Sequence, residues 1–304
     1  MCIRDSYQVL VCDNNSEDDS LKKIKDWANG KVSAQLSLHK EIEKCTYPAI
    51  QKPISYAEYI FFNNSFAEIE KENGQRLILI QNMKNLGFAG GNNVGIRYAL
   101  KKQDFGYIWL LNNDTVITKS ALKELVFFME SKVEVGICGS VLRYYYHPED
   151  IQGMGGCYYK FSGTSRHIKK IDELDKINYV IGASMMLSYE LIREIGLLSE
   201  EYFLYFEELD LAMRCKKYFK IACALKSIVY HKEGASIGTG EEGKQRSELA
   251  DYYIIRNRII FTKKFFPNYL FFVYIALFGA IINRLRRKQY KRIKVIIKIA
   301  LNWK

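Results

Sequence analysis

The sequence contains no pair of cysteines at C-x-x-C spacing. Its seven cysteines are an odd number and lie scattered along the chain, so they predict neither a disulfide framework nor a zinc site. The opening segment, residues 1–6, has too few apolar residues for a secretory signal. We therefore expect a protein of a reducing compartment, the cytoplasm.

Internal repeats and low-complexity tracts are also absent from the 304 residues, of which 48% are hydrophobic and 26% charged. A chain of this length and composition can bury one large α/β core and carry a short appendage. We predict a catalytic-sized domain over residues 1–245 and a C-terminal helical segment over residues 246–304.

The net charge is +11 and the pI is near 9.1, and much of the excess lies around Arg284–Lys294. This position favours an anionic membrane surface over nucleic acid as a partner. The preceding apolar run, Tyr269–Ile282, is about fourteen residues long, short of the roughly twenty that a spanning helix needs. The pattern predicts peripheral anchoring on the inner face of the cell membrane. The alternative is a C-terminal core helix with a solvated basic face.

Apolar runs followed by polar turns and helical patterns indicate an α/β fold. Strands are predicted at Tyr7–Cys12, Arg76–Gln81 and Tyr107–Leu111. Helices are expected from about Ser20, over Val94–Lys101 and over Lys119–Ser131. This order predicts a mostly parallel sheet with ligands at the carboxyl ends of its strands. Residues 30–75 show a weak pattern and are interpreted as a surface insertion.

Asp114 ends the motif Asn112-Asn113-Asp114 directly after a hydrophobic strand. A carboxylate at the edge of a sheet suits Mg²⁺ or Mn²⁺, which prefer one or two protein oxygens together with substrate phosphates. The same residues also form ordinary helix caps and turns.

The segment Gly87–Gly95 has too many glycines for a helix start and is interpreted as a loop that offers backbone N–H groups to an anion. It does not have G-x-G-x-x-G spacing, so it is not a dinucleotide fingerprint. A tight structural turn is the alternative.

Three carboxylates, Glu207, Glu208 and Asp210, follow an aromatic run that begins at Tyr202. Carboxylates beside an aromatic wall tend to have a raised pKa, which suits a general base. Alternatively, acids are favoured at a helix start, and Asp210 could form an i, i+4 ion pair with Arg214. His231 ends another apolar run and is either a metal ligand or a structural histidine.

The order of these segments resembles that of the family-2 inverting glycosyltransferases, particularly their bacterial rhamnosyltransferase-like branch. The resemblance covers about residues 7 to 265. The segments that carry it are VCDNNSEDDS (11–20), NLGFAGGNNVGI (85–96), WLLNNDT (109–115), VIGASMML (180–187), IGLLSEEYFLYFEELDLAMRC (195–215) and HKEGASIG (231–238).

The resemblance implies a GT-A fold that uses a divalent metal, Mg²⁺ or Mn²⁺, and a nucleotide-diphosphate sugar donor. Asp114 and His231 would hold the metal, and Glu208 would be the base. Gly182–Ser184 would line the acceptor side. The implied acceptor is a glycan or lipid-linked hydroxyl in cell-envelope polysaccharide synthesis. Contacts to the nucleotide would come from Asp13, Asn15, Asn85, Gly87, Gly91, Asn92 and Asn113.

The sequence departs from this family in two places. The acidic pair is Glu-Glu where the family has Glu-Asp, so Glu207 and Asp210 remain alternatives to Glu208 as the base. The family also begins with a further strand and helix before Tyr7, and we expect this chain to lack that unit and one wall of the nucleotide pocket. A non-catalytic sugar-nucleotide or membrane-binding homologue is the strongest rival interpretation, followed by a nucleotidyltransferase.

Overall fold

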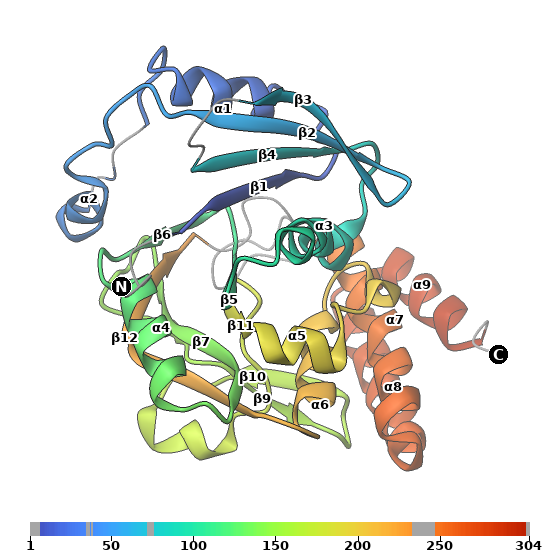
Figure 1. Cartoon of the computed structure of the whole chain (residues 1–304). Helices are drawn as coiled ribbons and strands as arrows, with labels where there is room; N and C mark the ends of the chain where they lie inside the picture. The colour runs from blue at the N-terminus through green and yellow to red at the C-terminus, as the bar shows by residue number, and fades with distance from the viewer. Residues whose placement is uncertain (1–6, 35–36, 38, 72–75, 233–246, 302–304) are drawn as a thin grey trace. The chain divides into compact units, whose positions relative to one another are not determined.

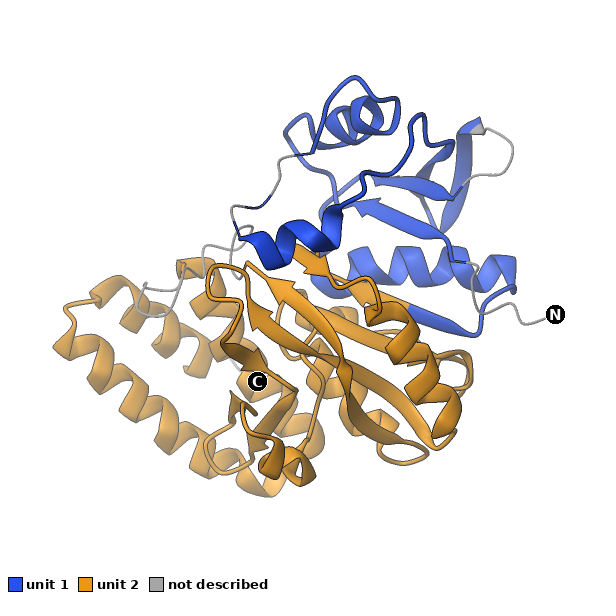
Figure 2. Cartoon of the chain, turned by 90° about the vertical axis from the view of Figure 1, so that its left-hand side faces the viewer, with its two compact units in different colours: residues 1–108 blue, residues 109–304 orange. Residues whose placement is uncertain are grey.

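The computed structural model describes residues 7–34, 37, 39–71, 76–232 and 247–301. The chain divides into two compact units, residues 1–108 and 109–304 (Figure 2). The expected boundary between residues 245 and 246 stays a prediction. The segments 1–6 and 233–246, which include most of the HKEGASIG motif, lie outside the described residues.

The first unit is built on a four-stranded sheet in the order β1-β4-β2-β3 (Figure 1). β1 and β2 are both parallel to β4, and β3 is antiparallel to β2. Its strands are β1 (Val9–Asp13), β2 (Tyr56–Phe62), β3 (Ser65–Lys71) and β4 (Leu77–Asn82), and its helices are α1 (Ser20–Ala28), α2 (Lys40–Thr46) and α3 (Gly87–Lys102).

The interpretation of residues 30–75 as a surface insertion is wrong, because β2 is a largely buried strand of this sheet. Its pattern is hard to recognise in the sequence because Glu58 interrupts the apolar run. The Glu58 carboxylate is buried, and it is paired with the Lys25 ammonium at 3.0 Å. A buried charge of this kind is tolerated only with such a partner.

The interpretation of the glycine-rich segment as a loop is also wrong, because α3 begins at Gly87. Gly91 shows why glycine is needed within this helix. A Cβ atom at Gly91 would lie 3.3 Å from the side chain of Asn14, in the turn after β1. The small residue therefore lets the first turns of α3 pack closely on the end of β1, which compensates for its low helix propensity.

The second unit contains a mixed sheet in the order β5-β11-β7-β12-β6, with β8 paired to β7. β12 is parallel to β7, whereas β11 and β6 are antiparallel to their neighbours β7 and β12. The expectation of a mostly parallel sheet thus holds for the first unit and not for the second. The strands are β5 (Tyr107–Leu111), β6 (Thr115–Ile117), β7 (Val135–Tyr144), β8 (Ile151–Gly153), β11 (Ser184–Ser188) and β12 (Lys220–His231), with a separate hairpin of β9 (Gly156–Tyr159) and β10 (Thr164–His167).

Helices pack around this second sheet and continue into the C-terminal segment, where α7, α8 and α9 lie side by side (Figure 1). Their shared core consists of Ile255 and Ile259 of α7, Leu277 of α8, and Ile296 and Ile299 of α9. The helices of the unit are α4 (Ala121–Ser131), α5 (Tyr189–Ile195), α6 (Glu207–Cys215), α7 (Glu248–Phe265), α8 (Leu270–Arg286) and α9 (Tyr290–Leu301).

The apolar C-terminal helix is longer than the sequence pattern indicates. Among the described residues, one helical segment, Pro267–Arg286, is long and apolar enough to cross a membrane when judged by length and composition alone. Only 11% of it is buried within the protein. Length therefore does not exclude a membrane span, contrary to the estimate from Tyr269–Ile282.

Candidate active site

Asp114 and His231 are brought together by strand pairing in the second unit. β6 follows Asp114 directly and pairs with the end of β12, so that Thr115 lies opposite His231. The His231 Nε2 atom lies 3.2 Å from Asp114 Oδ1. Both side chains are nearly buried, with 11% and 8% of their surfaces exposed. Two residues more than a hundred positions apart thus share one polar site.

Gln152, on β8, fixes the orientation of the His231 ring. Its Oε1 atom lies 2.9 Å from His231 Nδ1, and the glutamine is buried. Because an amide oxygen only accepts, His231 Nδ1 carries the proton that it donates to Gln152. Nε2 then faces Asp114: it donates to this carboxylate when the ring is protonated, and it offers a lone pair to a metal when the ring is neutral.

The donor set at Asp114 and His231 fits a divalent cation. Asp114 Oδ1 is shielded from solvent, and its polar neighbour is the His231 ring, 3.2 Å away. Burial raises the pKa of Asp114, but the hydrogen bonding and charge of His231 outweigh it, so the net pKa lies below its usual range. An ionised carboxylate oxygen beside an imidazole nitrogen is a suitable ligand pair for Mn²⁺ or Mg²⁺, with substrate oxygens completing the shell.

Glu207 and Glu208 begin α6, directly after a strained loop. Phe203, Tyr205 and Phe206 have φ values of 64°, 65° and 77°, a region that is costly for residues other than glycine. Such strain persists only where the surrounding structure imposes it, and it is concentrated at functional sites.

Asn257 of α7 imposes this loop conformation. Its side chain is fully buried, and its Nδ2 atom lies 2.8–2.9 Å from the carbonyl oxygens of Tyr202, Leu204 and Tyr205. One amide group therefore satisfies three backbone acceptors of the loop that positions the acidic pair. No sequence pattern around Asn257 indicates this role.

Glu207 is buried and Glu208 is half-buried, and neither forms an ion pair among the described residues. Burial raises the pKa of Glu208 to about 7. Burial and the neighbouring charge of Glu208 raise the pKa of Glu207 well above its usual value. In each glutamate the Oε2 atom is shielded from solvent and has no hydrogen-bond partner among the described residues. A carboxylate with a pKa near 7 and an unpaired oxygen has the properties of a general base.

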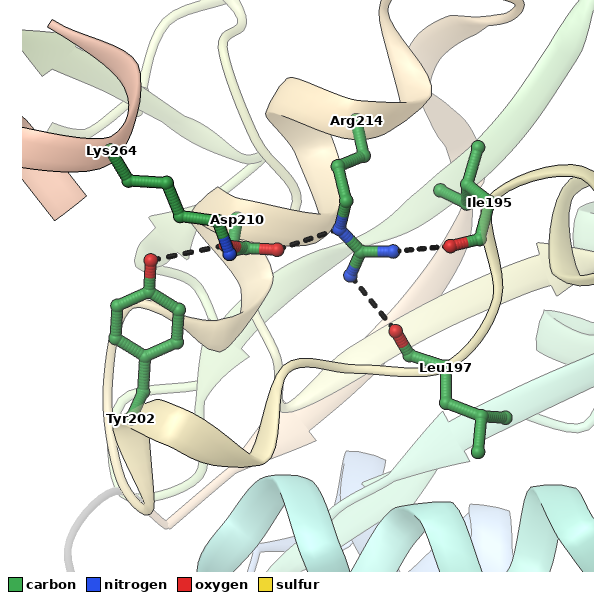
Figure 3. A network of polar contacts seen from close by, with 6 residues as sticks. All are labelled: Ile195, Leu197, Tyr202, Asp210, Arg214 and Lys264. Atoms are coloured by element: carbon green, nitrogen blue, oxygen red, sulfur yellow. Dashed lines mark hydrogen bonds and ion pairs between the residues drawn. The ribbon is translucent and has the colours of Figure 1, made fainter.

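Asp210, two residues further along α6, has the opposite environment (Figure 3). Its fully buried carboxylate accepts a hydrogen bond from Tyr202 at 3.0 Å and forms ion pairs with Arg214 at 2.7 Å and Lys264 at 2.6 Å. Arg214 also donates to the carbonyl oxygens of Ile195 and Leu197. These contacts favour the ion-pair alternative for Asp210 over a role as base.

Ser184 is likewise committed to the protein interior. Its hydroxyl is buried, accepts from Trp109 Nε1 at 2.9 Å and donates to Ser140 at 2.8 Å. These bonds connect three strands of the second sheet. The side chain is therefore not available to line an acceptor surface.

In the first unit, the nucleotide-binding candidates surround Asn14. Its Nδ2 donates to Asn85 Oδ1 and to the Gly87 carbonyl oxygen, both at 3.0 Å, while its Oδ1 accepts from Asn82 and from the Leu86 backbone N–H. This side chain ties the end of β1 to the start of α3. Asn14 belongs to the DNNS motif, but its residue type alone did not separate it from Asp13 and Asn15.

The other candidates lie around this junction. Asp13 is buried at the end of β1 and accepts from the Ser16 backbone N–H at 3.2 Å. Asn15 is exposed with a φ of 63°. Asn85 accepts from the Gly87 N–H at 2.9 Å, and Asn92 donates to the Phe88 carbonyl oxygen at 2.9 Å. In the second unit, Asn113 is exposed beside Asp114. Donor contacts from these residues stay a prediction.

Comparison with known proteins supports this picture at the level of the family. Residues 63–196 match the profile of "Glycosyl transferase family 2". This part of the chain is therefore similar to the glycosyltransferase family 2 domain. The matched range includes the start of α3 and Asp114, whereas Glu208 and His231 lie outside it.

Two relatives are similar to this chain over part of its length. One is the low-salt glycan biosynthesis hexosyltransferase Agl10 of Haloferax volcanii, 27% identical over 53% of this chain and 54% of the relative. The other is the dTDP-rhamnosyl transferase RfbF of Shigella flexneri, 26% identical over 66% of each protein. The chain thus spans between about half and two thirds of the length of these relatives.

A solved structure shares the fold. The mannosyltransferase PcManGT from Pyrobaculum calidifontis, in complex with GDP-Man and Mn²⁺, matches 98% of this chain and 78% of its own, with a TM-score of 0.50 and 12% identity. The match confirms the GT-A α/β fold class predicted from the sequence.

Proposed function

We propose that this protein is an inverting, metal-dependent glycosyltransferase that moves a hexose, of rhamnose type or another, from a nucleotide-diphosphate donor to a hydroxyl of a glycan or lipid-linked acceptor. The observation that carries the proposal is the Glu208 carboxylate, whose Oε2 atom is shielded and has no hydrogen-bond partner among the described residues, and whose pKa is raised by burial to about 7. The family and the two relatives support transfer of a sugar in glycan synthesis.

Each residue of the site has a distinct role in this proposal. Deprotonated Glu208 takes the proton from the acceptor hydroxyl, whose oxygen attacks the anomeric carbon as the diphosphate leaves from the opposite face. Asp114 and His231 would hold the divalent metal, which when bound stabilises negative charge on the departing diphosphate. Gln152 keeps His231 Nε2 directed toward that position. Asn257 and the strained loop hold Glu208 in place.

The location follows from the same proposal. The protein works in the cytoplasm, and its C-terminal segment binds the inner face of the cell membrane. The support is the apolar segment Pro267–Arg286 and the fact that no acidic residue follows Asp251 in the sequence. A lipid-linked acceptor would be presented at that surface.

The decisive experiment measures nucleoside diphosphate release from UDP- and dTDP-sugars with Mn²⁺ and candidate acceptors over pH 5.5–8.5. Because Glu208 must be deprotonated, kcat/KM should fall about tenfold for each pH unit below about 7. Glu208→Gln should lose activity by about 10²–10⁴-fold, whereas Glu201→Gln, an exposed control, should not. Full activity of Glu208→Gln would remove this residue from the mechanism.

The main alternative is a homologue that binds sugar nucleotides without turning them over. The Glu-Glu pair in place of Glu-Asp favours it. Donor binding without metal-dependent release of nucleoside diphosphate would establish this alternative. Release of pyrophosphate from a nucleoside triphosphate would instead indicate a nucleotidyltransferase.

A further inference from the structure

Helix α8 is apolar on two opposite sides, and among the described residues one side is buried and the other is exposed. Val273 and Leu277 are buried, and Leu277 belongs to the helical core shared with α7 and α9. Phe271, Ile275, Phe278, Ile282 and Leu285 are 37–69% exposed. Their spacing of four, three, four and three residues places them on one face, which we call the outer stripe of α8.

The outer stripe continues onto the β9–β10 hairpin. Phe161, at the hairpin tip, is 57% exposed. Its ring centre lies 4.9 Å from that of Tyr269 and 5.4 Å from that of Phe272, both rings meeting it edge to face. Phe272 in turn contacts Phe271 of the stripe at 5.8 Å. A strand connector and a helix about a hundred residues apart therefore form one exposed apolar surface.

Gly163 fixes the hairpin tip against this helix. It has a φ of +64°, and a Cβ atom there would lie 2.6 Å from Arg258 Cγ and 3.2 Å from Val273 Cγ2. The tip therefore packs tightly on α7 and α8, and its aromatic side chain is held in register with the outer stripe.

The charges beside this surface are cationic. Lys160, next to Phe161, has its Nζ atom 4.6 Å from the centre of the Tyr269 ring. The exposed cations Arg286, Arg287 and Lys288 lie at the other end of α8. A second copy of this chain, with a net charge of +11, would bring like charges to the surface. An anionic lipid bilayer complements both the apolar stripe and its cationic ends.

Packing determines how a bilayer would meet this surface. α9 is packed on α8 through Ile296 and Ile299 and exposes Lys291, Lys294 and Lys298. If α8 crossed the bilayer in this packing, these cations would be carried into hydrocarbon at about 2.5–3.5 kcal/mol each. Contact along one face of α8, over about 21 Å, leaves them at the lipid headgroups.

From these observations we infer that the hairpin tip at Phe161 and the outer stripe of α8 form a single surface that lies in the interface of an anionic bilayer. The inference deepens the membrane part of the proposed function and rests on it. It adds the β9–β10 hairpin, which is outside the C-terminal segment, as a second element of membrane contact.

The test uses the full chain with vesicles of phosphatidylcholine containing about one third phosphatidylglycerol, and vesicles of phosphatidylcholine alone. Phe161→Ser and Phe278→Ser should each lower partition into the anionic vesicles about tenfold or more, as expected for removing one phenyl side chain from lipid. Phe127→Ser is the matched control, since Phe127 is 62% exposed on α4 of the same unit. Partition should fall in the absence of phosphatidylglycerol.

A second measurement does not depend on affinity. With Phe161→Trp, lipids brominated on their acyl chains should quench the added fluorescence, whereas the signal added by Phe127→Trp should not change. If Phe161 behaves like Phe127 while Phe278→Ser still lowers partition, the hairpin has no membrane role and the inference is overturned. The inference would also be overturned if the wild-type protein were a dimer in solution and Phe161→Ser made it a monomer, because the surface would then bind a second copy of the chain. Because partition and quenching are measured without donor, their failure is distinguishable from failure of sugar transfer.

Discussion

Glu208 and Asp210 are carboxylates two residues apart on α6 whose environments differ in the number of partners. Asp210 has three donors within 3.0 Å and contributes to stability as a buried, compensated charge. Glu208 forms no ion pair among the described residues, and burial raises its pKa to about 7. The same helix thus carries one carboxylate held by three donors and one that can gain and lose a proton near neutral pH.

At the residue scale, Gln152 provides a direct test of the proposed metal site. Gln152→Leu should leave His231 free to rotate and to change tautomer, and should lower Mn²⁺ affinity about 10–100-fold. The measurement is Mn²⁺ binding by electron paramagnetic resonance, which needs no donor or turnover. Gln152→Glu keeps an acceptor for Nδ1–H and should retain more affinity than the leucine variant. Equal affinity in all three proteins would contradict the assigned role.

At the scale of elements, the loop before α6 depends on a helix that follows it by about fifty residues. Asn257→Leu removes the donor for three carbonyl oxygens, at a cost of about 1–3 kcal/mol for each one left unpaired in the interior. We expect a lower midpoint of chemical unfolding together with a lower kcat. The exposed Asn283→Ala should change neither quantity. A stable variant with full activity would show that the loop holds its conformation without Asn257.

The same scale shows which parts of the fold the sequence predicts. The predicted strand Tyr107–Leu111 coincides with β5. This run is short, apolar and bounded by polar turns, a pattern that predicts a buried strand. The first turns of α3 and the strand β2 were missed for opposite reasons. Glycine lowers helix propensity, yet Gly91 is required for contact with Asn14, and Glu58 interrupts an apolar run, yet Lys25 compensates its charge. In both cases the deciding partner is more than thirty residues away in the sequence.

The candidate site has the same limit. Asp114, His231 and the acidic pair were recognisable by residue type and by their positions at the ends of apolar runs. Gln152 and Asn257 were not, because an isolated amide side chain has no pattern that indicates what it will bond. Whether Glu208 or Asp210 is free to act as a base depends on Lys264 and Tyr202, which only the folded chain brings to Asp210.

For the whole molecule, the relation between the C-terminal segment and α6 can be tested at Lys264. Lys264→Met removes one of the two cations that compensate Asp210 and should lower the free energy of unfolding by about 1–2 kcal/mol. The loss is expected to be smaller than for a fully buried pair, because the lysine side chain is 39% exposed and Arg214 remains. Lys263→Met, at the exposed neighbouring position, is the control. Equal stability of both variants would contradict this contribution.

The ion pair between Lys264 and Asp210 also couples the position of α7 to that of α6. α7 supplies both this cation and the Asn257 amide, so the helix that leads into the tail holds α6 at two points. Truncation of the chain after residue 245 would remove the Lys264 ammonium that pairs with Asp210. It would also remove the Asn257 amide that binds the loop before α6. The C-terminal segment is therefore part of the catalytic unit and not an independent membrane anchor. Any displacement of α7 would also move Glu207 and Glu208.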